Sequence, residues 1–383
     1  MTNFIAERIP ISVLTGFLGS GKTTLLSRLL RHPAMSRTAV VINELGEVGL
    51  DGALVEAVDE EMVVLDSGCI CCTVRGDLVE TLGRLREARE NGRGPAFERV
   101  LVETTGLADP TPILHTLMTD PALAAGYRMD GVITTIDAVL GADQLDRHTQ
   151  SVKQAALADR LVLTKSDLAD PETVQALTAR LRSINPAVVP IRVVRGAVDP
   201  DALLGAGHPD LASRTADVRA WLNEEAAAQD GHGGHGHDCA SGCDHHGPHH
   251  GAFRHDDRIA SFCLSGDAPM DWADVDEAFG LLLQLHGEQV LRVKGLLDVR
   301  GSDRPIVIHG VQHLFSEPAM LAAWPDGMNG TRIVFITHDL PEARVRQVLE
   351  PFLPIARGAE PGRRDHGGHP PPPVTTTHPH GEP

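Results

Sequence analysis

A glycine-rich stretch near the start of the chain, GFLGSGKT at residues 16–23, is the strongest indication of the fold. It fits the pattern G-x-x-x-x-G-K-[ST] and stands between an apolar run, Ile9–Leu14, and a helical run, Leu25–Leu30. Such glycines let backbone N–H groups turn toward a phosphate, and a helix N-terminus adds a favourable dipole. In this pattern the lysine reaches the β- and γ-phosphates and the last hydroxyl binds Mg²⁺. The residues expected to hold the nucleotide phosphates and Mg²⁺ are Gly16, Gly19, Ser20, Gly21, Lys22, Thr23 and Thr24.

Further apolar runs follow, and most are unbroken stretches of Val, Ile and Leu. Such runs are typical of strands covered on both faces. They alternate with helical stretches such as Leu78–Arg89 and Glu172–Arg182, which predicts an α/β, P-loop NTPase domain with a mostly parallel sheet. The expected strands are Thr38–Ile42, Met62–Leu65, Arg99–Val102, Val132–Ile136, Leu161–Leu163 and Pro190–Val194.

The composition divides the 383 residues into four parts. Residues 1–228 form the predicted nucleotide-binding domain, and residues 229–257, rich in Gly and His, are expected to be a flexible linker. Residues 258–358 resume a globular pattern with clustered strands, which predicts a smaller α+β domain. The Pro- and His-rich tail, 359–383, is expected to be disordered.

The choice of nucleotide depends on the four residues after the strand Leu161–Leu163, which read TKSD. The carboxylate of Asp167 can accept two hydrogen bonds from guanine, whereas adenine would leave it unpaired. Lys165 is expected to pack along the base. The usual first residue of such a motif is Asn, and Thr164 lacks its amide group. The motif favours GTP over ATP.

An acidic residue ends another expected strand, Arg99–Val102, in the sequence ETTG. Open parallel sheets bind ligands at the carboxyl ends of their strands. We therefore expect Glu103 to organise either Mg²⁺ or the attacking water, and Gly106 to donate its N–H to the γ-phosphate. Asp137, which ends the run Val132–Ile136, is a second candidate for the acidic role. Together these features predict a GTPase that forms GDP and phosphate.

Three cysteines lie within four positions after the run Met62–Leu65. Cys69, Cys71 and Cys72 are too close together for an unstrained disulfide. In a C-x-C-C loop, three thiolates can converge on Zn²⁺ and leave its fourth position open, which suits a site that gives its metal away. Glu44 and Glu47 follow another strand end and are candidates to supply a carboxylate to the same metal or to Mg²⁺.

Many of the 20 histidines lie in the linker and the tail. Imidazoles spaced by glycine bind several divalent ions without selecting one. They can raise the local metal supply, or they can belong to a solubilising linker that binds metal incidentally.

The charge and length of the chain exclude several classes of protein. A net charge of −18 argues against nucleic acid or an anionic membrane as partner. No apolar run reaches the length of a membrane span, and the N-terminus lacks the pattern of a secretory signal, so we expect a cytoplasmic protein. Lysine is rare, with 4 Lys against 30 Arg, so a retained lysine indicates a need for its compact ammonium group. The four lysines are Lys22, Lys153, Lys165 and Lys294.

Together the motifs resemble the CobW family of P-loop GTPases, the metallochaperone group related to the UreG and HypB maturation proteins. The resemblance implies a GTPase that binds Zn²⁺, or a related ion such as Co²⁺, at Cys69, Cys71 and Cys72 and delivers it to a client metalloprotein. It extends into the second domain. The matching stretches are GFLGSGKTT (16–24), NELGEVGLDG (43–52), GCICCT (68–73), ETTGLADP (103–110), TKSD (164–167), RVKGLLDV (292–299) and RIVFITHDL (332–340).

Three other functions remain compatible with these residues. A GTPase of this kind could serve cobalt handling in cobalamin synthesis or activate a metalloenzyme. A metal buffer would bind ions through histidine and use nucleotide only as a sensor. An ATP-dependent kinase would use the same phosphate loop but would leave the cysteines unexplained. The oligomeric state is open, with a homodimer among the options.

Overall fold

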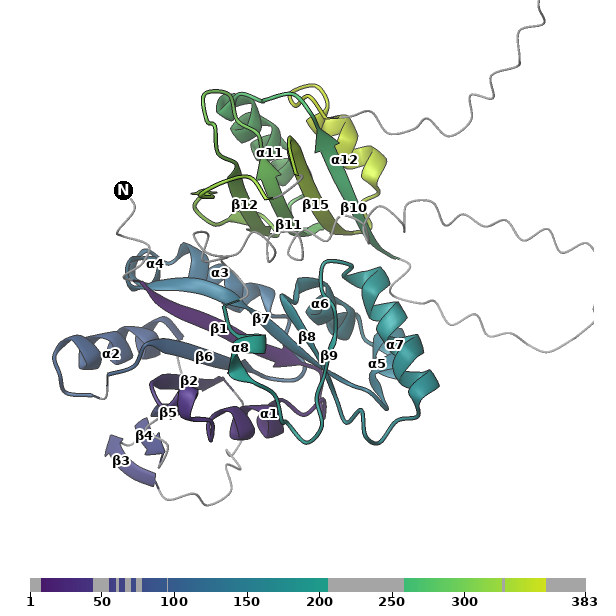
Figure 1. Cartoon of the computed structure of the whole chain (residues 1–383). Helices are drawn as coiled ribbons and strands as arrows, with labels where there is room; N and C mark the ends of the chain where they lie inside the picture. Colours follow the sequence, from purple (N-terminus) through teal and green to yellow (C-terminus); the bar gives the residue numbers. More distant parts are fainter. Residues whose placement is uncertain are drawn as a thin grey trace, which may run out of the picture.

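The computed structural model describes residues 8–43, 55–59, 62–65, 70–73, 78–94, 96–205, 258–325 and 328–355. These residues form a first domain, 8–205, and a second domain, 258–355, each built on its own sheet (Figure 1). The histidine-rich segments 229–257 and 359–383 and the predicted domain ends at 228 and 358 lie outside the described residues. Among the helices that are described, none is long and apolar enough to cross a membrane.

The first domain contains a nine-stranded sheet in the order β3-β4-β5-β2-β6-β1-β7-β8-β9. From β5 to β9 in that order, neighbouring strands run parallel, which confirms the predicted α/β fold. The strands are β1 (Ile9–Gly16), β2 (Thr38–Asn43), β3 (Val55–Asp59), β4 (Met62–Leu65), β5 (Ile70–Thr73), β6 (Arg99–Thr104), β7 (Tyr127–Asp137), β8 (Arg160–Thr164) and β9 (Ile191–Arg192).

One edge of this sheet differs from the expectation. Met62–Leu65 is a strand, but it pairs antiparallel with both β3 and β5 instead of joining the parallel set. The sequence did not predict β3 or β5. Each has only four or five residues, and β3 carries acidic side chains within its run, so neither shows a long apolar pattern.

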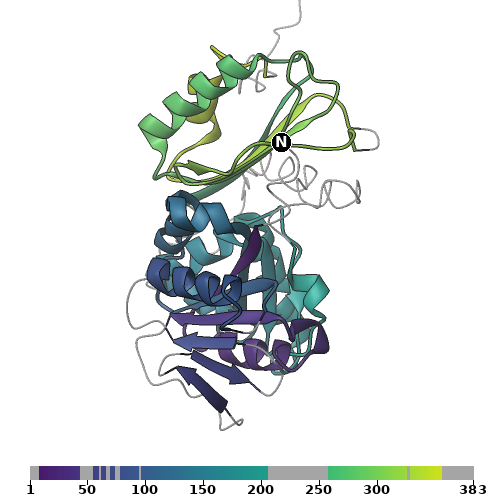
Figure 2. The same cartoon turned by 90° about the vertical axis from the view of Figure 1, so that its left-hand side faces the viewer.

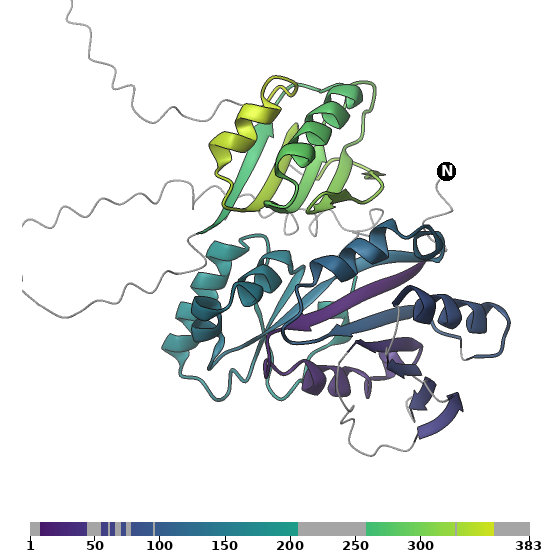
Figure 3. The same ribbon diagram turned by 180° about the vertical axis from the view of Figure 1, so that it is seen from behind.

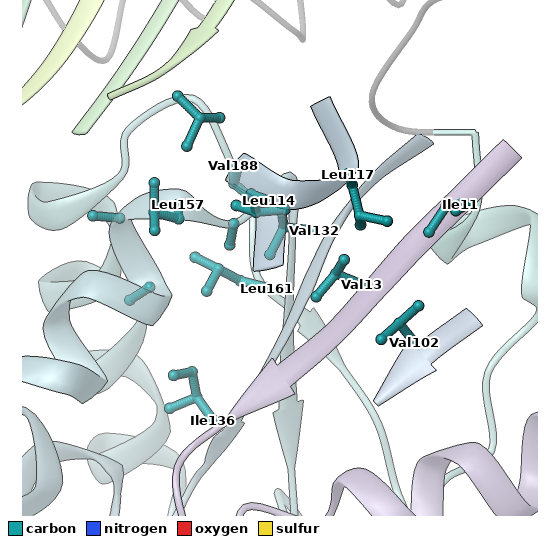
Figure 4. Packing of buried hydrophobic residues seen from close by; sticks show 14 of the residues in the cluster. Ile11, Val13, Val102, Leu114, Leu117, Val132, Ile136, Leu157, Leu161 and Val188 are labelled. Carbon is teal, nitrogen blue, oxygen red and sulfur yellow. The ribbon is translucent and has the colours of Figure 1, made fainter. Parts of the chain in front are cut away.

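Helices cover both faces of the sheet, as the unbroken apolar strands predict. In β1, Ile11 and Val13 join one buried cluster and Leu14 joins another, because neighbouring residues of a strand point to opposite faces. Figure 4 shows Ile11, Val13 and Val102 packed together in the larger cluster. The helices are α1 (Lys22–Leu29), α2 (Leu78–Glu90), α3 (Thr111–Thr119), α4 (Pro121–Gly126), α5 (Gly141–Arg147), α6 (Thr149–Leu157), α7 (Pro171–Ile184) and α8 (Pro200–Leu203).

The second domain is an antiparallel sheet in the order β10-β15-β11-β12-β13, with β14 paired to β12. Its two helices, α11 and α12, pack on the face away from the first domain (Figure 2). This confirms the predicted α+β domain. The elements are β10 (Ile259–Gly266), α11 (Trp272–His286), β11 (Val290–Leu297), β12 (Ile306–Val311), β13 (Leu314–Phe315), β14 (Ala319–Met320), β15 (Thr331–His338) and α12 (Glu342–Leu349).

The opposite face of that sheet packs on the first domain (Figure 3). Leu291, Val311 and Ile336 of the second domain belong to the same buried cluster as residues of α6 and α7. Helix α6 lies against β11, and α7 lies against β10. The two domains therefore share a hydrophobic core across their boundary.

Candidate nucleotide and metal site

The phosphate loop lies between β1 and α1, where the sequence predicts it. Gly16 has a φ of +142°, and a Cβ there would lie 2.2 Å from Oγ1 of Thr135, so a larger residue does not fit. The loop is tied to β7 because the hydroxyls of Ser20 and Thr135 are 2.7 Å apart. Gly21 caps the N-terminus of α1, and Thr24 is exposed in its first turn. This strand–loop–helix arrangement is the one that binds phosphate groups.

Two of the predicted groups meet beside this loop. The hydroxyl of Thr23 donates a hydrogen bond of 3.2 Å to Oε1 of Glu103, whose side chain is 1% exposed at the carboxyl end of β6. A hydroxyl and a carboxylate are oxygen donors, the kind of ligand that Mg²⁺ prefers, so the two residues fit the predicted ion. The ammonium group of Lys22 donates to the carbonyl oxygen of Gly16 at 2.9 Å.

The loop after β6 lies directly against the phosphate loop. A Cβ on Gly106 would come within 2.8 Å of backbone atoms of Leu18. Only glycine allows this close approach, since any side chain would collide with the neighbouring backbone. The structure therefore places Gly106 directly against the phosphate loop.

The TKSD motif, residues 164–167, also contacts the phosphate loop. The hydroxyl of Thr164 donates to the carbonyl oxygen of Ser20 at 2.6 Å, so threonine supplies an anchor in place of the usual asparagine amide. Lys165 donates to the carbonyl oxygen of Gly19 at 2.8 Å and to Oδ2 of Asp137 at 2.6 Å. Asp167 is exposed beyond them. The acid of Asp137 thus holds Lys165, which is a different task from the Mg²⁺ role considered above.

The metal motif is only partly described. Cys69, Glu44 and Glu47 lie outside the described residues, while Cys71 and Cys72 lie in β5, where a loop was expected. Strand β2 separates β5 from β6, and its Val41 pairs with Cys72 on one side and with Val102 on the other. Two strand spacings, about 10 Å, therefore separate the backbone of Cys72 from the residue next to Glu103. Within the described residues, no three His, Cys, Asp or Glu side chains are grouped to hold a metal ion.

Two residues of α6 contact the loop that bears Gly106, and the sequence did not assign either of them to the site. Nε2 of Gln154 donates to the carbonyl oxygens of Ala108 at 2.9 Å and Gly106 at 3.4 Å, and Lys153 pairs with Asp109 at 3.0 Å. Burial raises the pKa of Asp109, but hydrogen bonds from Thr111 and the Lys153 ammonium outweigh it and leave the pKa below its ordinary value. The scarcity of lysine was the one signal that pointed to Lys153.

Comparison with known proteins identifies the family. Residues 10–191 match the model of the CobW/HypB/UreG nucleotide-binding domain, and residues 259–353 match the cobalamin synthesis protein CobW C-terminal domain. The zinc chaperone YjiA of Escherichia coli K12 is 31% identical over 88% of this chain and 96% of that relative. The zinc chaperone CobW of a Sinorhizobium species is 30% identical over 89% of this chain and 96% of that relative.

A solved structure agrees with this assignment. The crystal structure of the Zn(II)-bound YjiA GTPase from E. coli superposes with a TM-score of 0.67 at 30% identity and covers 90% of this chain and 99% of that one. The match spans both domains in the order seen here. The chain therefore belongs to the CobW family of P-loop GTPases.

Proposed function

We propose that this protein hydrolyses GTP and uses the nucleotide to control a Zn²⁺ site at Cys69, Cys71 and Cys72, from which the metal passes to a client metalloprotein. The observation that carries the proposal is the register of the sheet. Cys72 and Val102, the neighbour of Glu103, pair with the same residue of β2. A rearrangement around Glu103 can therefore reach the cysteines through one intervening strand, β2. The relatives described above, which are zinc chaperones and a Zn(II)-bound GTPase, support the same ion.

Each residue around the phosphate loop has a separate role in the proposed hydrolysis of GTP. Lys22 neutralises charge on the β- and γ-phosphates, and the N–H of Gly106 binds the γ-phosphate as negative charge develops there. Mg²⁺, when held by Thr23 and Glu103, neutralises further phosphate charge. Glu103 also orients the attacking water. After hydrolysis the γ-phosphate contacts are gone, and the loop that bears Gly106 is free to move.

The cysteines supply the metal chemistry in this proposal. Cysteine thiols must lose their protons to bind Zn²⁺ as thiolates. Three thiolates leave one of the four coordination positions of Zn²⁺ for a ligand from the client. An incomplete shell lets the metal be transferred by ligand exchange. Glu44 and Glu47 are proposed as additional carboxylates because they follow β2, the strand between β5 and β6.

Zinc affinity should depend on the bound nucleotide. With the non-hydrolysable GTP analogue, we expect one site to bind Zn²⁺ about 5–150-fold more tightly than with GDP, corresponding to a coupling of about 1–3 kcal/mol. Chelator competition measures this in the nucleotide-free, GDP and analogue states. The Cys71→Ser/Cys72→Ser variant should lose the site, and Co²⁺ in the same assay tests the cobalt alternative.

A deletion of residues 229–257 and 359–383 provides the control for histidine binding. The tight, nucleotide-dependent site should persist in the shortened chain. If affinity ignores the nucleotide and disappears with the histidines, the protein is a metal buffer and the delivery proposal is wrong.

Replacing Asp167 by alanine tests guanine recognition. The change removes the carboxylate that accepts two hydrogen bonds from the base, and a hydrogen bond to a charged group contributes about 1.5–3 kcal/mol. Two such bonds are lost, so GTP affinity should fall by about 150-fold or more while ATP affinity stays the same. Isothermal titration with both nucleotides measures this, and an unchanged preference for GTP would contradict the assignment.

A further inference from the structure

The two lysines that do not touch the phosphate loop each form an ion pair at α6 or just after it. Lys153, on α6, pairs with Asp109 in the loop that bears Gly106. Lys294, on β11 of the second domain, pairs with Asp159 at 3.1 Å. Asp159 stands two residues after the last residue of α6. Helix α6 lies directly beneath the sheet of the second domain (Figure 1). A single short helix thus connects both pairs.

One side of α6 contacts both the phosphate loop and the loop that bears Gly106. The ring of His148, the residue just before α6, stacks on Phe17 of the phosphate loop with centroids 4.5 Å apart. Gln154 holds the carbonyl oxygens of Gly106 and Ala108, and its side chain is fully buried. A movement of the Gly106 loop therefore cannot leave α6 undisturbed.

The other end of α6 is fastened to the second domain. Arg292 of β11 donates to the carboxylate of Asp159 and to the carbonyl oxygen of Leu157, the last residue of α6. It also donates to Nε2 of His309 at 3.0 Å, and the N–H of Val132 donates to Asp159 at 3.0 Å. The side chains of Asp159, Arg292 and Lys294 are 1%, 2% and 4% exposed. These charged groups form a buried cluster between the domains.

Unsatisfied atoms occur at both ends of this connection. Oε1 of Gln154 and Nε of Arg292 are buried, and neither has a hydrogen-bond partner among the residues that the structure describes. An unpaired buried polar atom is costly, and native proteins keep few of them. A second arrangement that pairs either atom would compete with the present one, which is the property of a two-state element. A buried ion pair is also weak evidence for a stabilising role, because apolar residues of similar volume often give the folded protein the same stability or more.

We propose that α6 transmits the state of the γ-phosphate to the second domain, with Lys153 and Gln154 as positioning residues at one end and Asp159, Arg292 and Lys294 at the other. This inference rests on the proposed GTPase function, since it takes the Gly106 loop as the part that responds to nucleotide. When that loop moves, α6 shifts and the buried cluster changes its pairing. The second domain then presents a different surface in the GTP and GDP states.

Hydrogen exchange on the full chain tests the outward direction of this coupling. In the unaltered protein, amides of β11 and β12 should exchange at rates that differ at least 3-fold between GDP and a non-hydrolysable GTP analogue. The difference should vanish in Gln154→Leu and Lys153→Met, while Lys153→Arg should keep it because arginine can still pair with Asp109. Arg300→Ala, which breaks an exposed pair with Asp271 in the second domain, is the matched control and should keep the difference.

Nucleotide affinity tests the reverse direction. Coupling between two sites is reciprocal, so Lys294→Met in the second domain should change the ratio of GTP-analogue to GDP affinity by at least 3-fold, although it lies far from the phosphates. A merely structural role would weaken both nucleotides equally or leave both unchanged. Circular dichroism on each variant shows whether it is folded, and Asp159→Glu offers a milder change at the same cluster.

The outcomes separate this inference from the function on which it rests. If the unaltered protein hydrolyses GTP but β11 exchanges equally in both nucleotide states, the transmission through α6 is wrong and the GTPase stands. An exchange difference that survives both Gln154→Leu and Lys153→Met also overturns it. If the unaltered protein neither binds nor hydrolyses GTP, both proposals fail.

Discussion

Replacing Glu103 by glutamine should lower kcat for GTP hydrolysis by about 10²–10⁴-fold, the usual cost of losing a group that assists proton transfer or orients the reacting water. Glutamine has nearly the same shape, so it fits the buried position at the end of β6. It lacks the negative charge that faces the hydroxyl of Thr23. Single-turnover hydrolysis at saturating nucleotide measures the effect.

A magnesium titration separates the two roles assigned to Glu103. If the carboxylate mainly holds Mg²⁺, the variant should need a higher Mg²⁺ concentration and recover most of its kcat at saturation. If it mainly orients water, kcat should stay low at every Mg²⁺ concentration. Glu98→Gln is the matched control, because Glu98 forms an exposed pair with Arg37 one residue before β6. An unchanged kcat in the Glu103 variant would show that Glu103 has no role in hydrolysis.

The sequence signals that predict the nucleotide site are local. The phosphate loop and the apolar strands on each side of it are contiguous in the chain, and a parallel sheet brings the carboxyl ends of its strands to one edge. Glu103, Gly106 and Thr164 therefore meet the phosphate loop in the structure, although they come from distant motifs. Their meeting follows from the fold class alone.

Features that depend on contacts between distant segments were not predictable in the same way. The antiparallel pairing of β4 is set by β3 and β5, two strands too short to show a pattern. Helix α6 has no long amphipathic repeat, and its importance comes from what it touches at its two ends. The rarity of lysine marked Lys153 and Lys294, and Lys294 also lies in the matching stretch RVKGLLDV (292–299). Neither signal could say that the partners would be Asp109 and Asp159.

Removing the charge of Asp159 should destabilise the protein by about 3–5 kcal/mol at neutral pH, because Asp159→Asn leaves Arg292 and Lys294 buried without their counter-ion. Burial raises the pKa of Asp159, but the positive charges of Arg292 and Lys294 outweigh it and hold the pKa well below its ordinary value. Urea unfolding measures the loss. Asp271→Asn breaks an exposed pair with Arg300 and should cost no more than about 1 kcal/mol.

The pH dependence of that loss identifies its cause. Burial lowers the pKa of Lys294 to about 8, although the nearby Asp159 acts to raise it. Without that carboxylate the pKa falls further, so folded Lys294 loses its proton at a lower pH in the variant. Since the unfolded chain still binds the proton there, the variant gains stability with rising pH before the unaltered protein does. The destabilisation should therefore shrink between pH 6 and pH 8 and then level off.

A second substitution tests whether the titration of Lys294 causes this pH dependence. In Asp159→Asn/Lys294→Met the titrating ammonium is gone, and an apolar side chain of similar length takes its place. The double variant should be more stable than Asp159→Asn at pH 6, and it should lose most of the pH dependence that Asp159→Asn shows relative to the unaltered protein. If the single and double variants are equally unstable at every pH, the cost comes from lost hydrogen bonds and not from an uncompensated charge between the domains.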